Sequence, residues 1–406
     1  MAHISPFQPF RYAAAAGPIE HLVTQPYDKI SPAMRERYLA LSPYNLVRII
    51  LGGREPDDYA RAAHCFDEWV ASGLLAQDAE PGFFAYFQEF QLPDSDERLV
   101  RKGFIGLGAV EDYEARVVHR HEQTLTGPKK DRLEVLRHTH AHFGQIFMLY
   151  PGPAESVDQI LHEASRGEPL ATVQDEYGTI HRLWKIGDPA SIARMRAEMA
   201  PKKLLIADGH HRYETALAFR DENPQMADAR NVMMTFVNMH APGLRILATH
   251  RVVSGLPEFQ PQSFFAKVAT EKLPSLSALK ELFATPAPDR IRIGVALRGT
   301  EAIYLMDRAR KPDELDVQVL HRELLGGALG IGEEAVREEK YLRYVRGLDA
   351  AYVDVASGEA QIAFLMEPTP IEQMAEIAFG GGVLPQKTTD FYPKLLTGLA
   401  IYKLER

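Results

Sequence analysis

The segment from Asp208 to Arg212 brings together residue types that proton transfer and anion binding require. Its sequence, Asp-Gly-His-His-Arg, places a carboxylate, two imidazoles and a guanidinium within five residues. An apolar run at 204–207 precedes it and is typical of a buried strand, whereas the residues after it repeat at helical spacing. Gly209 can adopt backbone conformations that other residues resist. The pattern predicts a strand, a turn and a helix whose first turn attracts an anion such as phosphate.

Asp208, His210, His211 and Arg212 are therefore candidate catalytic residues, and Gly209 is a candidate for contact with a bound cofactor. The imidazoles and the carboxylate can transfer protons, and the guanidinium supplies a fixed positive charge beside the anion. A structural interpretation is also open, in which Asp208 caps the helix and both histidines are surface residues.

A second polar cluster, at 117–132, follows another strand-like region and contains histidines, a carboxylate and several cations. Glu122 is its best candidate for a general base, because a carboxylate flanked by cations stays ionised and can accept a hydroxyl proton. His121 is a candidate ligand for a cofactor phosphate. The alternative is a solvated, charged loop.

Prolines fix a third polar segment, at 25–32. Ser31 can cap a helix that begins at Pro32, which favours a structural role for that serine. Tyr27 and Asp28 are ambiguous between structure and function.

A glycine run at 380–382 leads into Lys-Thr-Thr and invites comparison with a phosphate-binding P-loop. The P-loop pattern requires glycine immediately before the lysine, and Gln386 stands there, so the match fails. Two interpretations remain open: a flexible loop that brings Lys387 or Lys394 to an anion, and a plain turn between domains.

Three histidines, His138, His140 and His142, alternate along the chain. On a strand, all three imidazoles would lie on one face, where they could bind zinc. The preceding residues, 131–136, have a helical pattern that would spoil this alignment.

Strand-like segments recur along the chain with helical patterns between several of them, which predicts an α+β, or mixed α/β, protein. The expected strands lie at 83–90, 104–110, 145–150, 179–186, 204–207, 232–237 and 290–297. A seam rich in proline at 254–261 indicates a boundary between a domain at 1–255 and a C-terminal α/β domain at 256–406.

The 406 residues are 46% hydrophobic and 25% charged, an ordinary globular composition that suffices for about two to three domains. Lysine and arginine number 46 against 55 aspartates and glutamates, a net charge of −9, so no global positive field favours nucleic acid. The only cysteine, Cys65, cannot form an internal disulfide and is predicted to lie in the core. No apolar run approaches the ~18 residues of a membrane span and no signal peptide is apparent, so we expect a cytoplasmic protein without a membrane partner.

Through nearly its whole length the chain resembles a bacterial and archaeal family known as domain of unknown function 1015. The segments that carry the resemblance lie at 25–31, 121–124, 207–216, 237–239, 248–251 and 384–394. The Asp-Gly-His-His-Arg segment also resembles the phosphate-handling motif of the ParB/sulfiredoxin-like superfamily. Members of that superfamily include free serine kinases, sulfiredoxins and nucleotide-binding partition proteins.

The resemblance implies a ParB/sulfiredoxin-like core and a nucleotide-dependent reaction. Free serine kinases are the members closest in motif, which implies phosphoryl transfer from ATP or ADP to the hydroxyl of L-serine. Sulfiredoxin chemistry needs a cysteine, and Cys65 lies outside the motif. One departure is Thr388-Thr389-Asp390, where a Ser-Thr pair followed by an aromatic residue is expected; it keeps a hydroxyl but adds a charge.

On this interpretation, backbone amides after Asp208 hold a phosphate, and the side chains of the next helical turn neutralise charge on the transferring group. Glu122 takes the serine proton, and Asp208 is the candidate ligand of Mg²⁺, because hard carboxylate oxygens suit that ion. The residues expected to bind the cofactor are Gly209, His121, Lys387 and Lys394. The rival interpretations are a non-enzymatic nucleotide-binding regulator related to partition proteins, and a nucleotidase. The acidic net charge and the lack of a clear helix-turn-helix pattern count against contact with nucleic acid.

Overall fold

The computed structural model describes all residues except 94, 123–125, 312–313, 386 and 406. The chain forms two compact units. Unit 1 comprises Met1–Arg245, Ala375–Val383 and Pro393–Arg406, and unit 2 comprises Ile246–Met374 and Leu384–Tyr392. Both units combine helices with sheets, which confirms the predicted α+β class.

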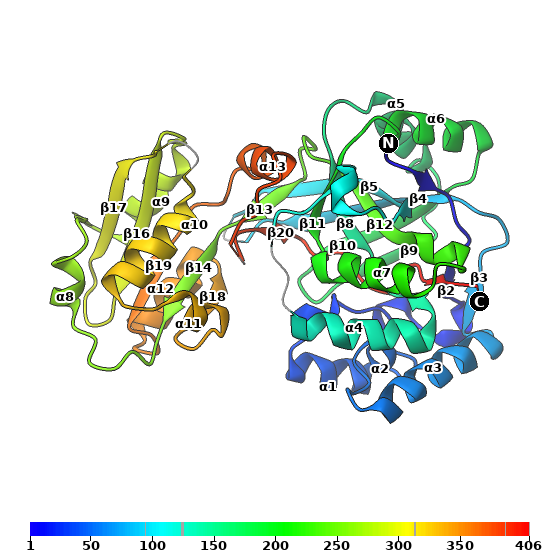
Figure 1. The fold of residues 1–406 in the computed structure, drawn as a ribbon, viewed down its shortest axis with the longest axis horizontal. Coiled ribbons are helices and arrows are strands. Elements are labelled where there is room, and N and C mark those ends of the chain that lie inside the picture. Colours follow the sequence, from blue (N-terminus) through cyan, green and yellow to red (C-terminus); the bar gives the residue numbers. More distant parts are fainter. Residues whose placement is uncertain (94, 123–125, 312–313, 386, 406) are drawn as a thin grey trace. The chain divides into compact units, whose positions relative to one another are not determined.

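A mixed sheet forms the centre of unit 1 (Figure 1). Within the described residues it has nine strands, in the order β6-β11-β8-β12-β5-β4-β10-β9, with β1 paired to β5. The bounds are β1 Ile4–Ser5, β4 Phe83–Gln91, β5 Arg98–Ala109, β6 Val118–His119, β8 Ile146–Tyr150, β9 Ala171–Gln174, β10 Ile180–Ile186, β11 Leu204–Asp208 and β12 Asn231–Asn238. The strands predicted from residues 83 to 237 are all present, most with shifts of one residue at their ends, but the strand predicted at 104–110 begins earlier, at Arg98.

Helices cover both faces of this sheet (Figure 1). On one side α7 contacts β8 and β12, α4 packs on α7, and α3 packs on α4; on the other side α5 and α6 pack together. The bounds are α1 Pro32–Leu41, α2 Val47–Ile50, α3 Pro56–Ala71, α4 Thr126–Thr139, α5 Glu155–Ala164, α6 Pro189–Met199 and α7 His210–Glu222. Because both faces are covered, β8 is buried along its whole length.

One sequence-based expectation about these helices is confirmed, since the Ser31 hydroxyl accepts a hydrogen bond from the Met34 amide at 3.2 Å and Pro32 occupies the first turn of α1. Cys65, predicted to lie in the core, lies on α3 and is only partly buried against the apolar cluster that α2, α3 and α4 share.

Short elements complete unit 1. The C-terminal segment returns to it, since β21 (Tyr402–Lys403) pairs with β7 (Ala141–His142). A second small pairing joins β2 (Phe10–Tyr12) and β3 (Leu75–Gln77), and the short helices are η1 Ala14–Ala16, η2 Ile19–His21, η3 Tyr27–Lys29, η4 Tyr113–Ala115 and η5 Ala227–Arg230.

An antiparallel sheet forms the centre of unit 2, and its described residues form six strands in the order β15-β17-β16-β19-β14-β18. The bounds are β14 Thr249–Val253, β15 Glu271–Leu273, β16 Arg290–Leu297, β17 Ile303–Ala309, β18 Leu342–Arg346 and β19 Ile362–Leu365. Alternate residues of β16 and β19 enter two different apolar clusters, as expected for a sheet covered on both faces. The predicted strand at 290–297 is β16.

The helices of unit 2 supply those two clusters. Phe264 of α8 and Leu324 of a π-helix belong to one cluster, and Leu279 of α9 and Val355 of α12 belong to the other. The bounds are α8 Pro261–Phe265, α9 Leu276–Ala284, α10 Asp316–Val319, the π-helix Leu320–Ala328, α11 Glu333–Arg337 and α12 Leu348–Ala356. Three elements lie where the chain crosses between units, namely β13 Arg245–Leu247, α13 Ile371–Phe379 and β20 Asp390–Tyr392.

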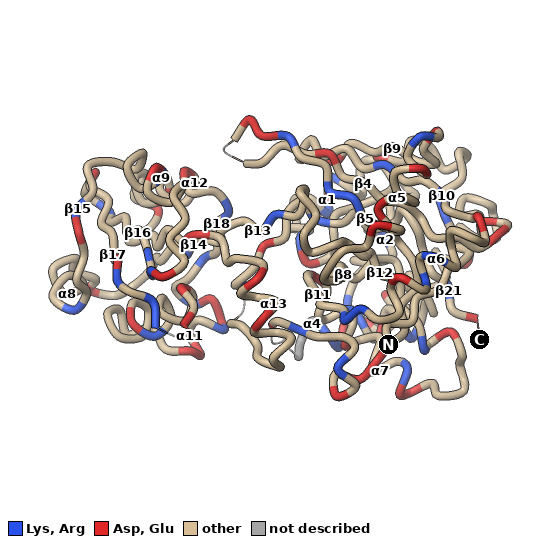
Figure 2. Tube along the Cα trace, turned by 90° about the horizontal axis from the view of Figure 1, so that it is seen from above, with Lys and Arg blue, Asp and Glu red and all other residues tan. Residues whose placement is uncertain are grey.

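Acidic and basic residues are interspersed along the chain in both units (Figure 2). Among the helices that the structure describes, none combines the length and apolar character needed to cross a bilayer.

Candidate active site

Two parallel strands at one edge of the unit 1 sheet bring the main predicted segments together. Strands β6 and β11 pair in parallel, with Leu204 opposite Val118 and Leu205 opposite His119. Parallel strands end at the same edge of a sheet, which is where ligands bind in open α/β sheets. His121 lies two residues after the end of β6, and its Nδ1 is 2.7 Å from the Ile206 carbonyl of β11.

The turn after β11 has the geometry that its sequence predicts. The pairing of β11 with β8 is irregular between Ile206 and Asp208, and such bulges redirect the side chains that follow. Gly209 has a φ of 95° and is the residue at which α7 begins. The structural interpretation of Asp208 as the helix cap is wrong, because Gly209 occupies that position and no side chain caps it.

Arg212 folds back over this turn. Its Nη2 donates to Asp208 Oδ2 at 3.2 Å, and its Nη1 donates to the Gln145 carbonyl at 2.6 Å. A Cβ built on Gly209 would lie 3.0 Å from Arg212 Nε, so glycine is required by both conformation and space. The guanidinium is therefore held at the N-terminus of α7, where the first backbone N–H groups lack partners within the helix.

The carboxylate of Asp208 lies among cations. Lys394 Nζ is 3.9 Å from Asp208 Oδ1, and the Lys394 side chain is only 9% exposed. Burial raises the pKa of Asp208, but Lys394, Arg212 and Lys29 together lower it by more, and the pKa lies well below its ordinary value. Asp208 is therefore ionised at neutral pH. The structure brings Lys394 to the predicted turn, and it adds Lys29, which our sequence analysis does not single out.

The two histidines of the motif have different environments. His210 is buried, and burial together with the neighbouring His121 holds its pKa well below the ordinary value. Its Nε2 accepts a hydrogen bond from the His121 backbone amide at 3.4 Å. Burial therefore disfavours the predicted role of His210 as a cation, because a neutral imidazole cannot neutralise phosphate charge, and the catalytic role of His210 stays a prediction. His211 is partly exposed on the first turn of α7.

Glu122, which follows strand β6, lies beside His121. Its side chain is 21% exposed, and Oε1 lies 3.8 Å from His121 Nε2. Burial lowers the pKa of His121, although Glu122 and the Ile206 carbonyl act in the opposite direction. Since Nδ1 faces a carbonyl, His121 carries its proton on Nδ1 and is neutral. The next residues of this motif, Gln123 and Thr124, lie outside the described residues.

A small pocket adjoins Arg212 in unit 1. Its volume is about 70 Å³, and its lining includes Tyr27, Arg132, Phe143 and Thr397. The Arg132 guanidinium lies 4.3 Å from the centre of the Tyr27 ring. Burial, followed by the charge of Asp28, raises the pKa of Tyr27 to about 12, so its hydroxyl keeps its proton.

The three alternating histidines are not part of this group, and Lys387 belongs to the other unit. Helix α4 extends to Thr139, so His138, His140 and His142 do not share a strand face. His142 stacks against Tyr402, and among the described residues no group of three or more metal-ligating side chains is found. The zinc interpretation is therefore wrong for these histidines. Lys387 belongs to unit 2, where its carbonyl accepts a hydrogen bond from Arg251 at 3.0 Å.

Comparison with known proteins gives one family and several distant structures. The family model described as "Protein of unknown function (DUF1015)" matches residues 4–325. No curated protein matches the chain. Among solved structures, a conserved hypothetical protein from Pyrococcus furiosus has a TM-score of 0.36 at 12% identity, over 70% of this chain and 92% of that chain. A free serine kinase in complex with AMP has a TM-score of 0.36 at 12% identity, over 70% and 89% of the two chains. SbnI with a C-terminal truncation, from Staphylococcus aureus, has a TM-score of 0.37 at 11% identity, over 73% and 87%.

Proposed function

This chain belongs to the DUF1015 family, and we propose that it is a nucleotide-dependent kinase that phosphorylates the hydroxyl of a small molecule, with L-serine as the acceptor. The observation that carries the proposal is the N-terminus of α7, where Arg212 and Lys394 flank the Asp208 carboxylate. The motif at 208–212 supports serine as the acceptor through its resemblance to free serine kinases.

Electrostatics favour a phosphate group at this turn. Among the described residues, the cations Arg212, Lys394 and Lys29 all lower the pKa of the Asp208 carboxylate, and Lys29 Nζ also lies 4.0 Å from Asp28 Oδ2. The first amides of α7, which have no partners within the helix, and the positive end of the helix dipole also attract an anion. Phosphoryl transfer depends mainly on positioning and charge stabilisation, which such a site supplies.

Glu122 is the proposed general base. The acceptor hydroxyl gives its proton to the Glu122 carboxylate while its oxygen forms the new bond to the terminal phosphorus of the nucleotide. The bridging oxygen of the nucleotide leaves with the electron pair of the broken bond. The neutral His121 ring lies beside this base, with its Nε2 3.8 Å from Glu122 Oε1.

Mg²⁺ would be held by nucleotide phosphates and by Asp208. Oδ2 of Asp208 bonds to Arg212, whereas Oδ1 lies 3.9 Å from Lys394 Nζ and offers a hard oxygen. One or two carboxylates with phosphate oxygens are a common ligand set for this ion. When bound, Mg²⁺ would help to neutralise charge on the transferred group.

The direct test is product formation by the full chain. We would incubate it with Mg²⁺, ATP or ADP and a mixture of amino acids, and identify products by ³¹P NMR and mass spectrometry. The expected product is O-phosphoserine, with ADP formed from ATP or AMP formed from ADP. Nucleotide consumption without a phosphorylated amino acid would identify a nucleotidase instead. Tight nucleotide binding without consumption would identify a non-enzymatic regulator.

A further inference from the structure

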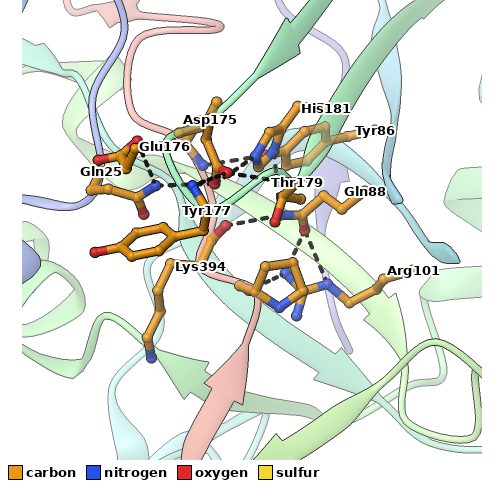
Figure 3. A network of polar contacts seen from close by, with 12 residues as sticks. Gln25, Tyr86, Gln88, Arg101, Asp175, Glu176, Tyr177, Thr179, His181 and Lys394 are labelled. Carbon is orange, nitrogen blue, oxygen red and sulfur yellow. Dashed lines mark hydrogen bonds and ion pairs between the residues drawn. The ribbon is translucent and has the colours of Figure 1, made fainter. Parts of the chain in front are cut away.

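A buried polar network in unit 1 holds the backbone on both sides of Lys394 (Figure 3). Arg101 Nη2 donates to the Pro393 carbonyl at 2.6 Å, and Gln88 Nε2 donates to the Lys394 carbonyl at 2.8 Å. The Leu396 amide donates to the Tyr86 hydroxyl at 3.2 Å. None of the three side chains Tyr86, Gln88 and Arg101 is more than 2% exposed. The Lys394 side chain extends away from the network (Figure 3).

The two donors to this segment also hold each other. Arg101 Nε donates to Gln88 Oε1 at 3.0 Å, which leaves the Gln88 amide nitrogen facing Lys394. The Arg101 guanidinium lies 4.5 Å from the centre of the Phe147 ring, which fixes its plane. Gln88 is therefore oriented as an acceptor for Arg101 and as a donor to the Lys394 carbonyl.

A second branch of the network connects Tyr86 to Gln25 through His181 and Asp175. The Tyr86 hydroxyl lies 2.7 Å from His181 Nδ1, and His181 Nε2 lies 3.2 Å from Asp175 Oδ2. The same carboxylate oxygen accepts a hydrogen bond from Gln25 Nε2 at 3.1 Å. Because Asp175 can only accept, His181 carries its proton on Nε2 and accepts from Tyr86 on Nδ1. Hydrogen bonds in such a chain strengthen one another.

The network thus bonds directly to the backbone of Lys394 and ends at Gln25, four residues before Lys29 in sequence. Gln25 lies shortly before η3, which ends at Lys29, and the other branch ends at Lys394. Burying an arginine and a histidine–carboxylate pair is costly, and apolar residues of similar size often stabilise a core as well or better. A role in geometry accounts for these buried groups better than a role in stability does.

We propose that Arg101, Gln88 and Tyr86 are positioning residues that hold Lys394 with its ammonium against Asp208 at the anion site. The part of this inference that concerns anion binding rests on the proposed function. The part that concerns the placement of Lys394 does not, so the two can fail separately.

Two variants remove the contacts to the Lys394 segment. Gln88→Glu keeps the acceptor for Arg101 but loses the donor to the Lys394 carbonyl, and Arg101→Met loses the donor to Pro393. Lys102→Met is the matched control for Arg101→Met, because Lys102 is the next residue on β5 and is exposed. Thermal unfolding shows which variants are folded, and Gln88→Glu decides the test if Arg101→Met does not fold.

The first measurement is the acylation rate of Lys394 in the full chain, followed by mass spectrometry. The exposed Lys272 serves as the internal reference. Loss of one buried hydrogen bond should raise the Lys394 rate about tenfold. The rate in Lys102→Met should equal that of the parent. An unchanged Lys394 rate in folded Gln88→Glu would overturn the proposal.

The second measurement is a double-mutant cycle on ADP affinity, with inorganic phosphate as a second probe. Gln88→Glu should weaken ADP binding about tenfold in the parent chain and have no effect in a Lys394→Met background. An equal loss in both backgrounds would show that Gln88 does not act through Lys394. If the parent binds neither probe, the proposed function fails, and the acylation rates alone decide the positioning role.

Discussion

Around Asp208, burial and ion pairing together decide which side chains carry charge. Burial keeps the imidazole of His210 neutral, whereas the cations Arg212 and Lys394 face the Asp208 carboxylate. The positive charge available to a phosphate therefore comes from arginine and lysine and not from the buried histidine. Glu122, on the neighbouring strand end, is left as the group suited to accept a proton.

We predict that Glu122→Gln lowers the rate of serine phosphorylation by about 10²–10⁴-fold and changes nucleotide affinity only a few-fold. The substitution keeps the shape of the side chain but removes the base. Steady-state kinetics and calorimetric titration with ADP measure the two quantities. Glu114→Gln, an exposed carboxylate in η4, is the control and should behave as the parent. A parent-like rate for Glu122→Gln would assign the base elsewhere.

Arg212→Lys should lower turnover by about 10²–10³-fold without unfolding the chain. A lysine cannot reproduce the planar fork that joins the Gln145 carbonyl to Asp208. The matched control is Arg220→Lys on the same helix, because Arg220 likewise donates to a backbone carbonyl, that of Val110, at 2.7 Å. Equal losses of turnover in both variants would indicate a general effect on α7.

At the scale of elements, the site depends on strand direction. Because β6 and β11 are parallel, the segments that follow them meet. Because β8 is antiparallel to β11, Gln145, which directly precedes β8, lies at the same edge. Helix α7 then begins at Gly209 without a side-chain cap, which leaves its first amides for a ligand.

Gly209→Ala should reduce ADP affinity and lower the free energy of unfolding by about 1–2 kcal/mol, because alanine resists the positive φ and its Cβ would meet Arg212. Gly178→Ala separates the two effects, since Gly178 also has a positive φ, of 80°, with its nearest neighbour at 4.0 Å. Urea denaturation and ADP titration should show a similar loss of stability in both variants but a loss of affinity only in Gly209→Ala. Parent-like ADP affinity in Gly209→Ala would remove the anion site from this turn.

Local patterns were sufficient to predict most of these elements. Apolar runs identified β4, β8, β11 and β12, and serine followed by proline identified the start of α1, because these signals act within a few residues. The alternating histidines were misleading, since the end of α4 interrupts a pattern that only a continuous strand would bring to one face.

At the scale of the whole molecule, local patterns carry no information about contacts between distant segments. Arg101 and the Pro393 carbonyl are 292 residues apart in sequence, and nothing near Arg101 indicates that it is buried. Lys29 was not predicted as a site residue for the same reason. Its charge lowers the pKa of Asp208 only because the two segments meet in unit 1. The return of Ala375–Val383 and Pro393–Arg406 to unit 1 is likewise a property of the tertiary fold.

Both units should lose stability as the pH falls below about 6.5. Burial lowers the pKa of His142 in unit 1 and of His250 and His321 in unit 2 to about 4, from 6.5. Between these values the unfolded chain binds protons that the folded chain does not. Stability is therefore complete above about pH 6.5 and falls by about 1.4 kcal/mol per pH unit for each such histidine.

Urea denaturation between pH 7.5 and 4.5 measures this slope. His142→Phe, which preserves an aromatic ring beside Tyr402, should reduce the proton uptake on unfolding by about one. His64→Phe is the control, because the His64 side chain is 75% exposed and should contribute nothing to the slope. An unchanged slope in His142→Phe would show that this imidazole is protonated in the folded state.

The late position of Lys394 in the chain has a consequence for synthesis on the ribosome. Lys394 follows Asp208 by 186 residues, which at about 5–20 residues per second corresponds to roughly 10–40 seconds of translation. During that interval the nascent unit 1 lacks Lys394, and Arg101 lacks the Pro393 carbonyl. We therefore expect the nascent anion site to remain open and incompletely charged, and chaperone contacts to persist on this part of the chain until the returning segment leaves the exit tunnel.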